Sequence, residues 1–288
     1  MIKLRGTGVA LVTPFNNDLS IDYEALEKLI NYQIAGNINY IVLMGTTGES
    51  VVLSNNEKRD IVNFSKKIIN NRVPIVLGVG GNNTLEIVNY LEKNDLSGIS
   101  AILSVSPSYN KPSQEGIIKH YKIISKSSPV PVIIYNVPGR TASNISAETT
   151  LKLANEISNI IGIKEASGDF DQIMTIIKKK PNDFLVISGD DGLTVPMIYM
   201  GANGVISVIG QSLPKEFSEM VNKALIGEIK EANKIHYKLH SYYNAIYSEG
   251  NPVGIKAHLE HLGICNSFVR PPLVQASEKI KSMLNSIQ

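Results

Sequence analysis

The chain has 288 residues, of which 43% are hydrophobic and 19% charged, and its formal net charge is +2. This length and composition indicate a globular protein built as one large barrel with a small appendage, or as two ordinary domains. The near balance of charge argues against a nucleic-acid-binding surface, and no apolar stretch approaches the roughly 18 residues of a membrane span. The single cysteine, Cys265, excludes an intrachain disulfide framework and suits a reducing compartment.

Short β-like runs alternate with longer amphipathic segments along most of the chain. The eight β-like runs cover residues 8–12, 40–44, 75–78, 101–104, 132–135, 160–164, 184–188 and 204–209. The helix candidates between and after them cover residues 22–35, 54–70, 84–94, 114–126, 146–156, 169–179, 192–200 and 214–226. Ser54 and Glu57 have the spacing of a capping box at the start of one helix. Such alternation predicts βαβ units, and eight of them in succession favour a closed (β/α)8 TIM barrel of the α/β class over residues 1–226.

The alternation stops after residue 226. Residues 228–247, 253–262 and 273–286 have helical patterns, and the intervening segments Gly250-Asn251-Pro252 and Arg270-Pro271-Pro272 are helix breakers. We therefore expect a small all-helical C-terminal domain over residues 227–288.

Lys164 closes an apolar run that fits a strand buried on both faces. In a barrel, functional residues lie in the loops that follow the strands, so this position is a candidate for chemistry. Two interpretations stay open from this stretch alone. Burial statistics favour a lysine that extends into solvent. The alternative is an amine directed into a pocket, where desolvation favours the neutral form that makes Schiff bases with carbonyl substrates.

Other strand ends also carry unusual residues. Thr46 and Thr47 lie between glycines and offer hydroxyl and backbone donors to a carboxylate, although the composition is equally that of a plain turn. We expect Tyr135 to face the mouth of the barrel and Arg140 to lie above it. None of the five histidines falls at a strand end, and His236 and His240 fit an ordinary helix surface, so we predict no metal and no cofactor.

Six motifs together resemble those of a known family. They are GTTGES at residues 45–50, SPSYNKP at 106–112, YNVPGRT at 135–141, GIKEASG at 162–168, SGDD at 188–191 and GVISV at 204–208. They are similar to the motifs of the class I, pyruvate-dependent aldolases, and within them to those of the dihydrodipicolinate synthases. The resemblance extends over nearly the whole chain, and the YNVPxRT pattern is its most specific part.

The resemblance implies a lyase that condenses pyruvate with L-aspartate 4-semialdehyde on the route to diaminopimelate and lysine. It implies an imine between Lys164 and pyruvate and a proton relay through Tyr135, Thr47 and Tyr109, with Tyr109 supplied by a neighbouring subunit. Binding roles fall to the remaining residues: Thr46 and Thr47 for the pyruvate carboxylate, Arg140 for the semialdehyde carboxylate, and Gly189 and Ile206 for the shape of the pyruvate pocket. The family also implies a cytoplasmic homotetramer assembled as a dimer of dimers.

The chain departs from the family in two places. Ser108 stands where relatives often have a tyrosine that borders the pocket for the inhibitor lysine, so we expect weak or absent inhibition by lysine. The segment 251–254 differs from the usual Asn-Pro-Ile-Pro, and we expect it to lie far from the chemistry. Two other functions stay open: an aldolase for a 2-keto-3-deoxy sugar acid or N-acetylneuraminate, and a catalytically inactive barrel that senses a ligand.

Overall fold

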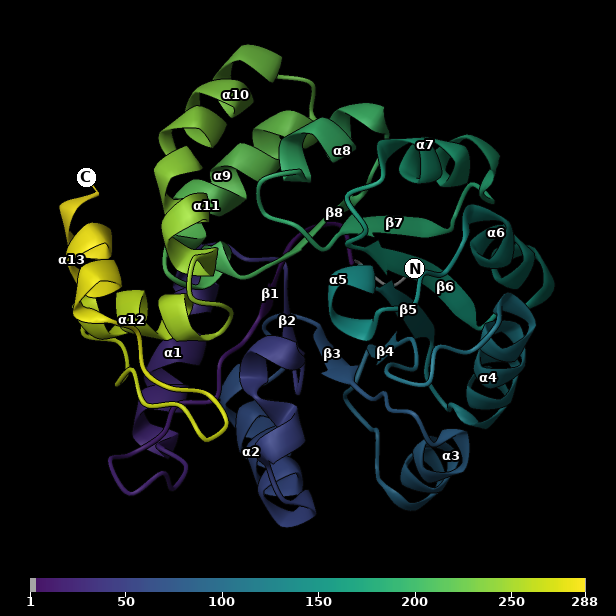
Figure 1. Ribbon diagram of the computed structural model, residues 1–288, viewed down its shortest axis with the longest axis horizontal. Coiled ribbons are helices and arrows are strands. Elements are labelled where there is room, and N and C mark those ends of the chain that lie inside the picture. The colour runs from purple at the N-terminus through teal and green to yellow at the C-terminus, as the bar shows by residue number, and fades with distance from the viewer. Residues whose placement is uncertain (1–3, 288) are drawn as a thin grey trace. The chain divides into compact units, whose positions relative to one another are not determined.

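The computed structural model describes residues 4–287, and its eight strands form a closed barrel in chain order (Figure 1). The strands are β1 (Gly6–Ala10), β2 (Tyr40–Leu43), β3 (Ile75–Gly78), β4 (Ala101–Val105), β5 (Val132–Asn136), β6 (Ile160–Glu165), β7 (Leu185–Ser188) and β8 (Gly204–Ser207). Neighbouring strands run parallel, as in the pairs β4–β5 and β5–β6. The predicted (β/α)8 barrel with a helical C-terminal region is therefore confirmed.

Residues 75–206 form one compact unit, the first unit. Its helices are α3 (Thr84–Lys93), α4 (Gln114–Ser127), α5 (Pro138–Thr141), α6 (Ala147–Glu156), α7 (Phe170–Lys179) and α8 (Thr194–Met200). Helices α4, α6 and α7 form an outer layer around the strands of this unit (Figure 1). Each turns an apolar stripe inward, as with Ile173 and Ile176 of α7, which are buried.

The second unit consists of residues 4–74 together with 207–287. It contains β1, β2, the 3-10 turns η1 (Thr46–Gly48), η2 (Ser50–Val52) and η3 (Ile209–Gln211), and the helices α1 (Tyr23–Ala35), α2 (Asn55–Ile69), α9 (Pro214–Leu225), α10 (Ile229–Lys238), α11 (His240–Tyr247), α12 (Val253–His261) and α13 (Glu278–Ser286). The predicted capping box at α2 is present: Glu57 N–H donates to Ser54 Oγ at 3.3 Å, and Ser54 N–H donates to Glu57 Oε2 at 2.8 Å.

Two predicted helices in the C-terminal region differ from the observed ones. The segment 228–247 is two helices, α10 and α11, which separate at Leu239. The segment predicted as helical from residue 273 begins its helix only after Ser277, whose Oγ accepts the N–H of Ile280 at 3.4 Å. Ser277 also donates its N–H and its hydroxyl to Glu249, at 2.8 and 2.6 Å, which fixes the cap in place. The proposed domain boundary at residue 226 falls between α9 and α10 and stays a prediction.

Candidate active site

Lys164 lies in strand β6 and is only 6% exposed, so the solvent-facing interpretation of this lysine is wrong. In the parallel register of β5 and β6, Tyr135 is the direct partner of Lys164. Directly paired residues place their side chains on the same face of a sheet. The Nζ atom of Lys164 accordingly lies 4.3 Å from the centroid of the Tyr135 ring. Strand register alone thus brings an amine and a phenol together in a buried position.

Gly189 follows strand β7 and packs against the stem of Lys164. A Cβ atom at position 189 would lie 3.0 Å from Lys164 Cε and 2.7 Å from the Cβ of Ala166. Its backbone N–H donates to the carbonyl of Glu165 at 2.8 Å, which holds the glycine at this distance. Any side chain here would displace the lysine stem, so glycine leaves room beside the amine. Ile206 of β8 is 1% exposed.

A polar network next to Tyr135 and Lys164 was missed in the sequence. Glu165 is fully buried, and its two carboxylate oxygens accept hydrogen bonds from Asn136 Nδ2, both at 3.1 Å. The N–H of Ser167 donates to the same carboxylate at 2.7 Å, and Gln172 Nε2 at 3.1 Å. Burial raises the pKa of Glu165, against the effect of these donors. The sequence does carry one signal for this network. Asn136 directly follows Tyr135, and Glu165 directly follows Lys164, each within a strand that is otherwise apolar.

This network also fixes the loop that carries Arg140. Asn136 Oδ1 accepts the N–H of Ile145 at 2.9 Å, so the segment between these residues is tied back to strand β5. Within it, the short helix α5 presents Arg140 on an exposed turn. Tyr109 is also exposed, at 90%, with a left-handed φ of 67°. The first unit therefore brings Tyr135, Lys164 and Gly189 together and leaves Arg140 and Tyr109 in solvent-facing loops.

Thr46 and Thr47 belong to the second unit, where they form turn η1 directly after strand β2. Thr46 is exposed, whereas Thr47 is only 2% exposed. The hydroxyl of Thr47 accepts a hydrogen bond from Asn251 Nδ2 at 2.9 Å. The expectation that segment 251–254 lies far from the candidate residues is therefore wrong. The two partners are 204 positions apart in sequence, and no local pattern indicates their contact.

A second buried lysine, Lys256, differs from Lys164 in its partner. It is fully buried and forms an ion pair with Glu49 Oε1 at 2.5 Å. The amine of Lys256 is engaged by a carboxylate, whereas the amine of Lys164 faces an aromatic ring. Lys164 is therefore the better candidate for a nucleophile.

Residues 4–287 contain no group of three or more histidine, cysteine, aspartate or glutamate side chains arranged to hold a metal ion. His236 contacts the hydroxyl of Tyr243 at 3.2 Å, which agrees with a structural position on the C-terminal helices. No helix in the described part of the chain is long and apolar enough to cross a membrane.

Comparison with known proteins places these residues in a family. The model of the dihydrodipicolinate synthetase family matches residues 3–288. The 4-hydroxy-tetrahydrodipicolinate synthase of Flavobacterium psychrophilum is 52% identical over 280 residues, which cover 97% of this chain and 96% of that protein. The dihydrodipicolinate synthase of Aquifex aeolicus is 38% identical, with a TM-score of 0.95 over 99% of this chain and 97% of that one. The enzyme of Acinetobacter baumannii, solved with pyruvate, is 36% identical, with a TM-score of 0.95 and coverage of 99% and 98%. The chain therefore belongs to the dihydrodipicolinate synthetase family.

Proposed function

We propose that this chain catalyses the 4-hydroxy-tetrahydrodipicolinate synthase reaction, the condensation of pyruvate with L-aspartate 4-semialdehyde in diaminopimelate and lysine biosynthesis. The observation that carries the proposal is the buried Lys164, whose amine lies against the Tyr135 ring, in a chain 52% identical to a synthase of that name. A catalytically inactive sensor would need no such amine, and relatives of this name favour the synthase over other pyruvate aldolases.

Lys164 supplies the nucleophile. Its neutral amine attacks the C2 carbonyl carbon of pyruvate to give a carbinolamine, which takes up a proton and loses water to give a protonated imine. The cationic imine accepts the electron pair left when a proton departs from the pyruvate methyl group, and the resulting enamine attacks the aldehyde carbon. Burial of Lys164 supports this role, because a water-poor pocket protects the imine from hydrolysis.

Tyr135 is the proton carrier next to the imine, and its contact with Lys164 supports that role. A tyrosine is a poor base near neutral pH unless its proton can move along hydrogen-bonded hydroxyls. We assign the next two hydroxyls of this relay to Thr47 and Tyr109, with Tyr109 reaching the pocket of a neighbouring subunit. The 90% exposure of Tyr109 supports the crossing, because a side chain that serves its own chain would be covered by it.

Carboxylate binding falls to two loops. Thr46 and Thr47 hold the pyruvate carboxylate with backbone and hydroxyl donors. Arg140, exposed at the tip of α5, receives the carboxylate of the semialdehyde, since a guanidinium binds a carboxylate through two parallel hydrogen bonds. Gly189 and Ile206 shape the pyruvate pocket, and the space that Gly189 leaves beside Lys164 Cε supports its part.

The assembly that fits these roles is a homotetramer built as a dimer of dimers, with its substrates supplied in the cytoplasm. A shared Tyr109 requires at least a dimer, so the monomer alone would be an incomplete enzyme.

The decisive test combines trapping with turnover. Purified protein mixed with pyruvate and borohydride gains one reduced pyruvate at Lys164, and excess chelator leaves the trapping unchanged. The same protein consumes pyruvate and L-aspartate 4-semialdehyde in an assay coupled to the next reductase. Lys164→Arg serves as the charge-matched control and loses both signals, because a guanidinium stays protonated and cannot attack a carbonyl. Labelling at another lysine would contradict the proposed mechanism.

A further inference from the structure

We propose that Glu165 is a positioning residue for the second substrate. Its buried carboxylate holds the loop of residues 137–145, and with it Arg140, in the arrangement that receives the carboxylate of the semialdehyde. The inference rests on the proposed function, in which Arg140 binds the semialdehyde and Lys164 binds pyruvate. Because Glu165 acts through the loop, its loss should affect the two substrates unequally.

The register of β5 against β6 separates Glu165 from the reacting residues. Tyr135 pairs with Lys164, and the next pair along the same two strands is Asn136 with Glu165. Successive side chains of a strand point to opposite faces. The first pair therefore belongs to the candidate active site, whereas the second pair lies on the other face of these strands. A change at Glu165 alters the second pair and leaves both side chains of the first pair in place.

The carboxylate of Glu165 is tied to both ends of the loop. Asn136 directly precedes the loop, and its Nδ2 donates to both Glu165 oxygens at 3.1 Å and to Asn144 Oδ1 at 2.8 Å. Its Oδ1 accepts the N–H of Ile145, at the other end of the loop, at 2.9 Å. Gln172 of α7 donates to Glu165 at 3.1 Å and accepts from Asn144 Nδ2 at 2.8 Å. The start of the loop thus binds Glu165 directly, and its end does so through two amide side chains.

Hydrogen bonds inside the loop connect these ends to Arg140. The hydroxyl of Thr141 donates to the carbonyl of Ser143 at 2.7 Å. The N–H of Ala142, a residue with a left-handed φ of 54°, donates to the carbonyl of Pro138 at 2.8 Å. Arg140 lies within this bonded segment, on the short helix α5. A shift of either loop end would therefore move the guanidinium as well.

The hydrogen bonds around Glu165 require a carboxylate and not an amide at this position. Its described side-chain partners are all donors: the amides of Asn136 and Gln172, and the N–H of Ser167 at 2.7 Å. The orientation of the Asn136 amide is fixed, because its oxygen accepts the backbone N–H of Ile145, a group that can only donate. A glutamine at position 165 would bring its NH2 group against one of these donors. Glu165→Gln therefore keeps the shape of the side chain and breaks the network.

The experiment measures the two substrates separately in Glu165→Gln. We expect kcat/KM for L-aspartate 4-semialdehyde to fall by about tenfold, the effect of one lost hydrogen bond to a charged group. Borohydride trapping of pyruvate at Lys164 should stay unchanged. In an Arg140→Ala background the same change should have no further effect on kcat/KM, because Arg140 is the residue through which Glu165 acts. Asn144→Ala, which alters an exposed side chain of the same network, should give a smaller loss in the same direction.

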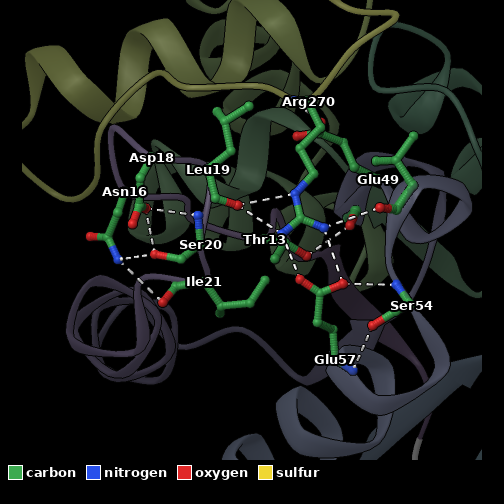
Figure 2. Close-up of polar contacts among 12 residues, drawn as sticks. Thr13, Asn16, Asp18, Leu19, Ser20, Ile21, Glu49, Ser54, Glu57 and Arg270 are labelled. Atoms are coloured by element: carbon green, nitrogen blue, oxygen red, sulfur yellow. Dashed lines mark hydrogen bonds and ion pairs between the residues drawn. The ribbon is translucent and has the colours of Figure 1, made fainter.

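Glu57 supplies a matched control, because its carboxylate also accepts several hydrogen bonds but belongs to the second unit. Figure 2 shows it between the guanidinium of Arg270, at 2.5 and 3.1 Å, and the N–H of Ser54, at 2.8 Å. Glu57→Gln should lower the free energy of unfolding in urea and leave kcat/KM for the semialdehyde unchanged. The same loss of kcat/KM in Glu57→Gln would mean that reduced stability, and not the loop, explains the effect of Glu165→Gln.

Three further results would overturn the inference. One is an unchanged kcat/KM for the semialdehyde in Glu165→Gln, or in Asn144→Ala if Glu165→Gln does not fold. Another is an equal loss of pyruvate trapping, which would mean that Glu165 acts on Lys164 through strand β6. The third is additive losses from Glu165→Gln and Arg140→Ala. Failure of the unmodified enzyme to trap pyruvate at Lys164 or to consume the semialdehyde is a separate result, which would refute the proposed function and the inference with it.

Discussion

Replacing Lys256 by methionine tests the buried ion pair between Lys256 and Glu49. Lys256 and Glu49 are 0% and 2% exposed and lie 2.5 Å apart, and the Lys256 Nζ atom also lies 4.1 Å from the centroid of the Phe15 ring. Burial lowers the pKa of Lys256, and the Glu49 carboxylate opposes that effect. Methionine has a similar length and no charge, so the substitution mainly removes the cation.

The expected loss of stability follows from the Glu49 carboxylate, which the substitution leaves without its cation. Without Lys256, the Glu49 carboxylate stays buried, and among the described residues the N–H of Arg270 is the hydrogen-bond donor that it keeps. Breaking a buried ion pair on one side typically destabilises a protein by about 3–5 kcal/mol. Adding Glu49→Gln to Lys256→Met should recover part of this loss, since the second change removes the unpaired charge.

Urea unfolding at a fixed protein concentration measures both variants. A matched control is available in the exposed pair Lys122–Glu156, which has a similar 2.8 Å distance but side chains 48% and 44% exposed. Lys122→Met should change the free energy of unfolding far less than Lys256→Met does, because exposed ion pairs contribute little to stability. A cost below about 1 kcal/mol for Lys256→Met would refute the reasoning, because it would mean that the pair contributes no more than a surface pair does.

The remaining predictions concern substrates, sharing, pH and inhibition. Arg140→Ala should lower kcat/KM for the semialdehyde by about tenfold or more while leaving pyruvate trapping unchanged, because the lost contact is a charge-assisted one. Lys164→Ala and Tyr109→Phe proteins, each nearly inactive, should regain activity when mixed, and continued inactivity with heterodimers shown by native mass spectrometry would rule out a shared site. Burial lowers the pKa of His120 and His258 to about 4, so both stay neutral in the fold while the unfolded chain binds protons below pH 6.5. The free energy of unfolding should therefore fall as the pH drops from about 6.5 to 4, by up to about 3 kcal/mol for each histidine, and His258→Phe should flatten that dependence in urea titrations. Added lysine should inhibit weakly, because Ser108 replaces the tyrosine that borders the inhibitor pocket in relatives and so removes apolar contact with the ligand, and inhibition at sub-millimolar lysine would contradict this.

The barrel was predictable because it depends on short-range patterns, whereas the burial of Lys164 was not, since burial statistics for that stretch alone favour a lysine in solvent. Alternating apolar runs and amphipathic segments follow directly from strand and helix geometry, and a lysine at the end of a buried run is visible without knowing its neighbours. Tyr135 was also visible as a strand end. Its contact with Lys164 required the register of β5 against β6, which includes an irregularity between Val132 and Ile133 that no sequence pattern indicates.

The polar network around Glu165 was not predictable for a related reason. Glu165 accepts hydrogen bonds from Asn136 and from Gln172, which lie on β5 and α7. Each of these residues alone has the composition of a strand end or a helix surface. Only their convergence on one buried carboxylate shows that they hold the strands and the Arg140 loop in place.

The contacts between the C-terminal region and the turn that carries Thr47 and Glu49 were also not predictable from the sequence. From the sequence the C-terminal helices form an appendage, because the alternation that defines the barrel ends before them. In the structure, Asn251 and Lys256 contact the turn that carries Thr47 and Glu49, and Arg270 binds the backbone of Glu49 itself. A turn with a left-handed glutamate and a buried carboxylate is unfavourable alone, and it is held by partners in residues 251–270 and by the hydroxyl of Thr13, which donates to the carbonyl of Gly48 at 2.7 Å. A chain cut at residue 226 would lose the hydrogen bonds that hold Thr47 and Glu49, so residues of the C-terminal region are part of what stabilises this turn.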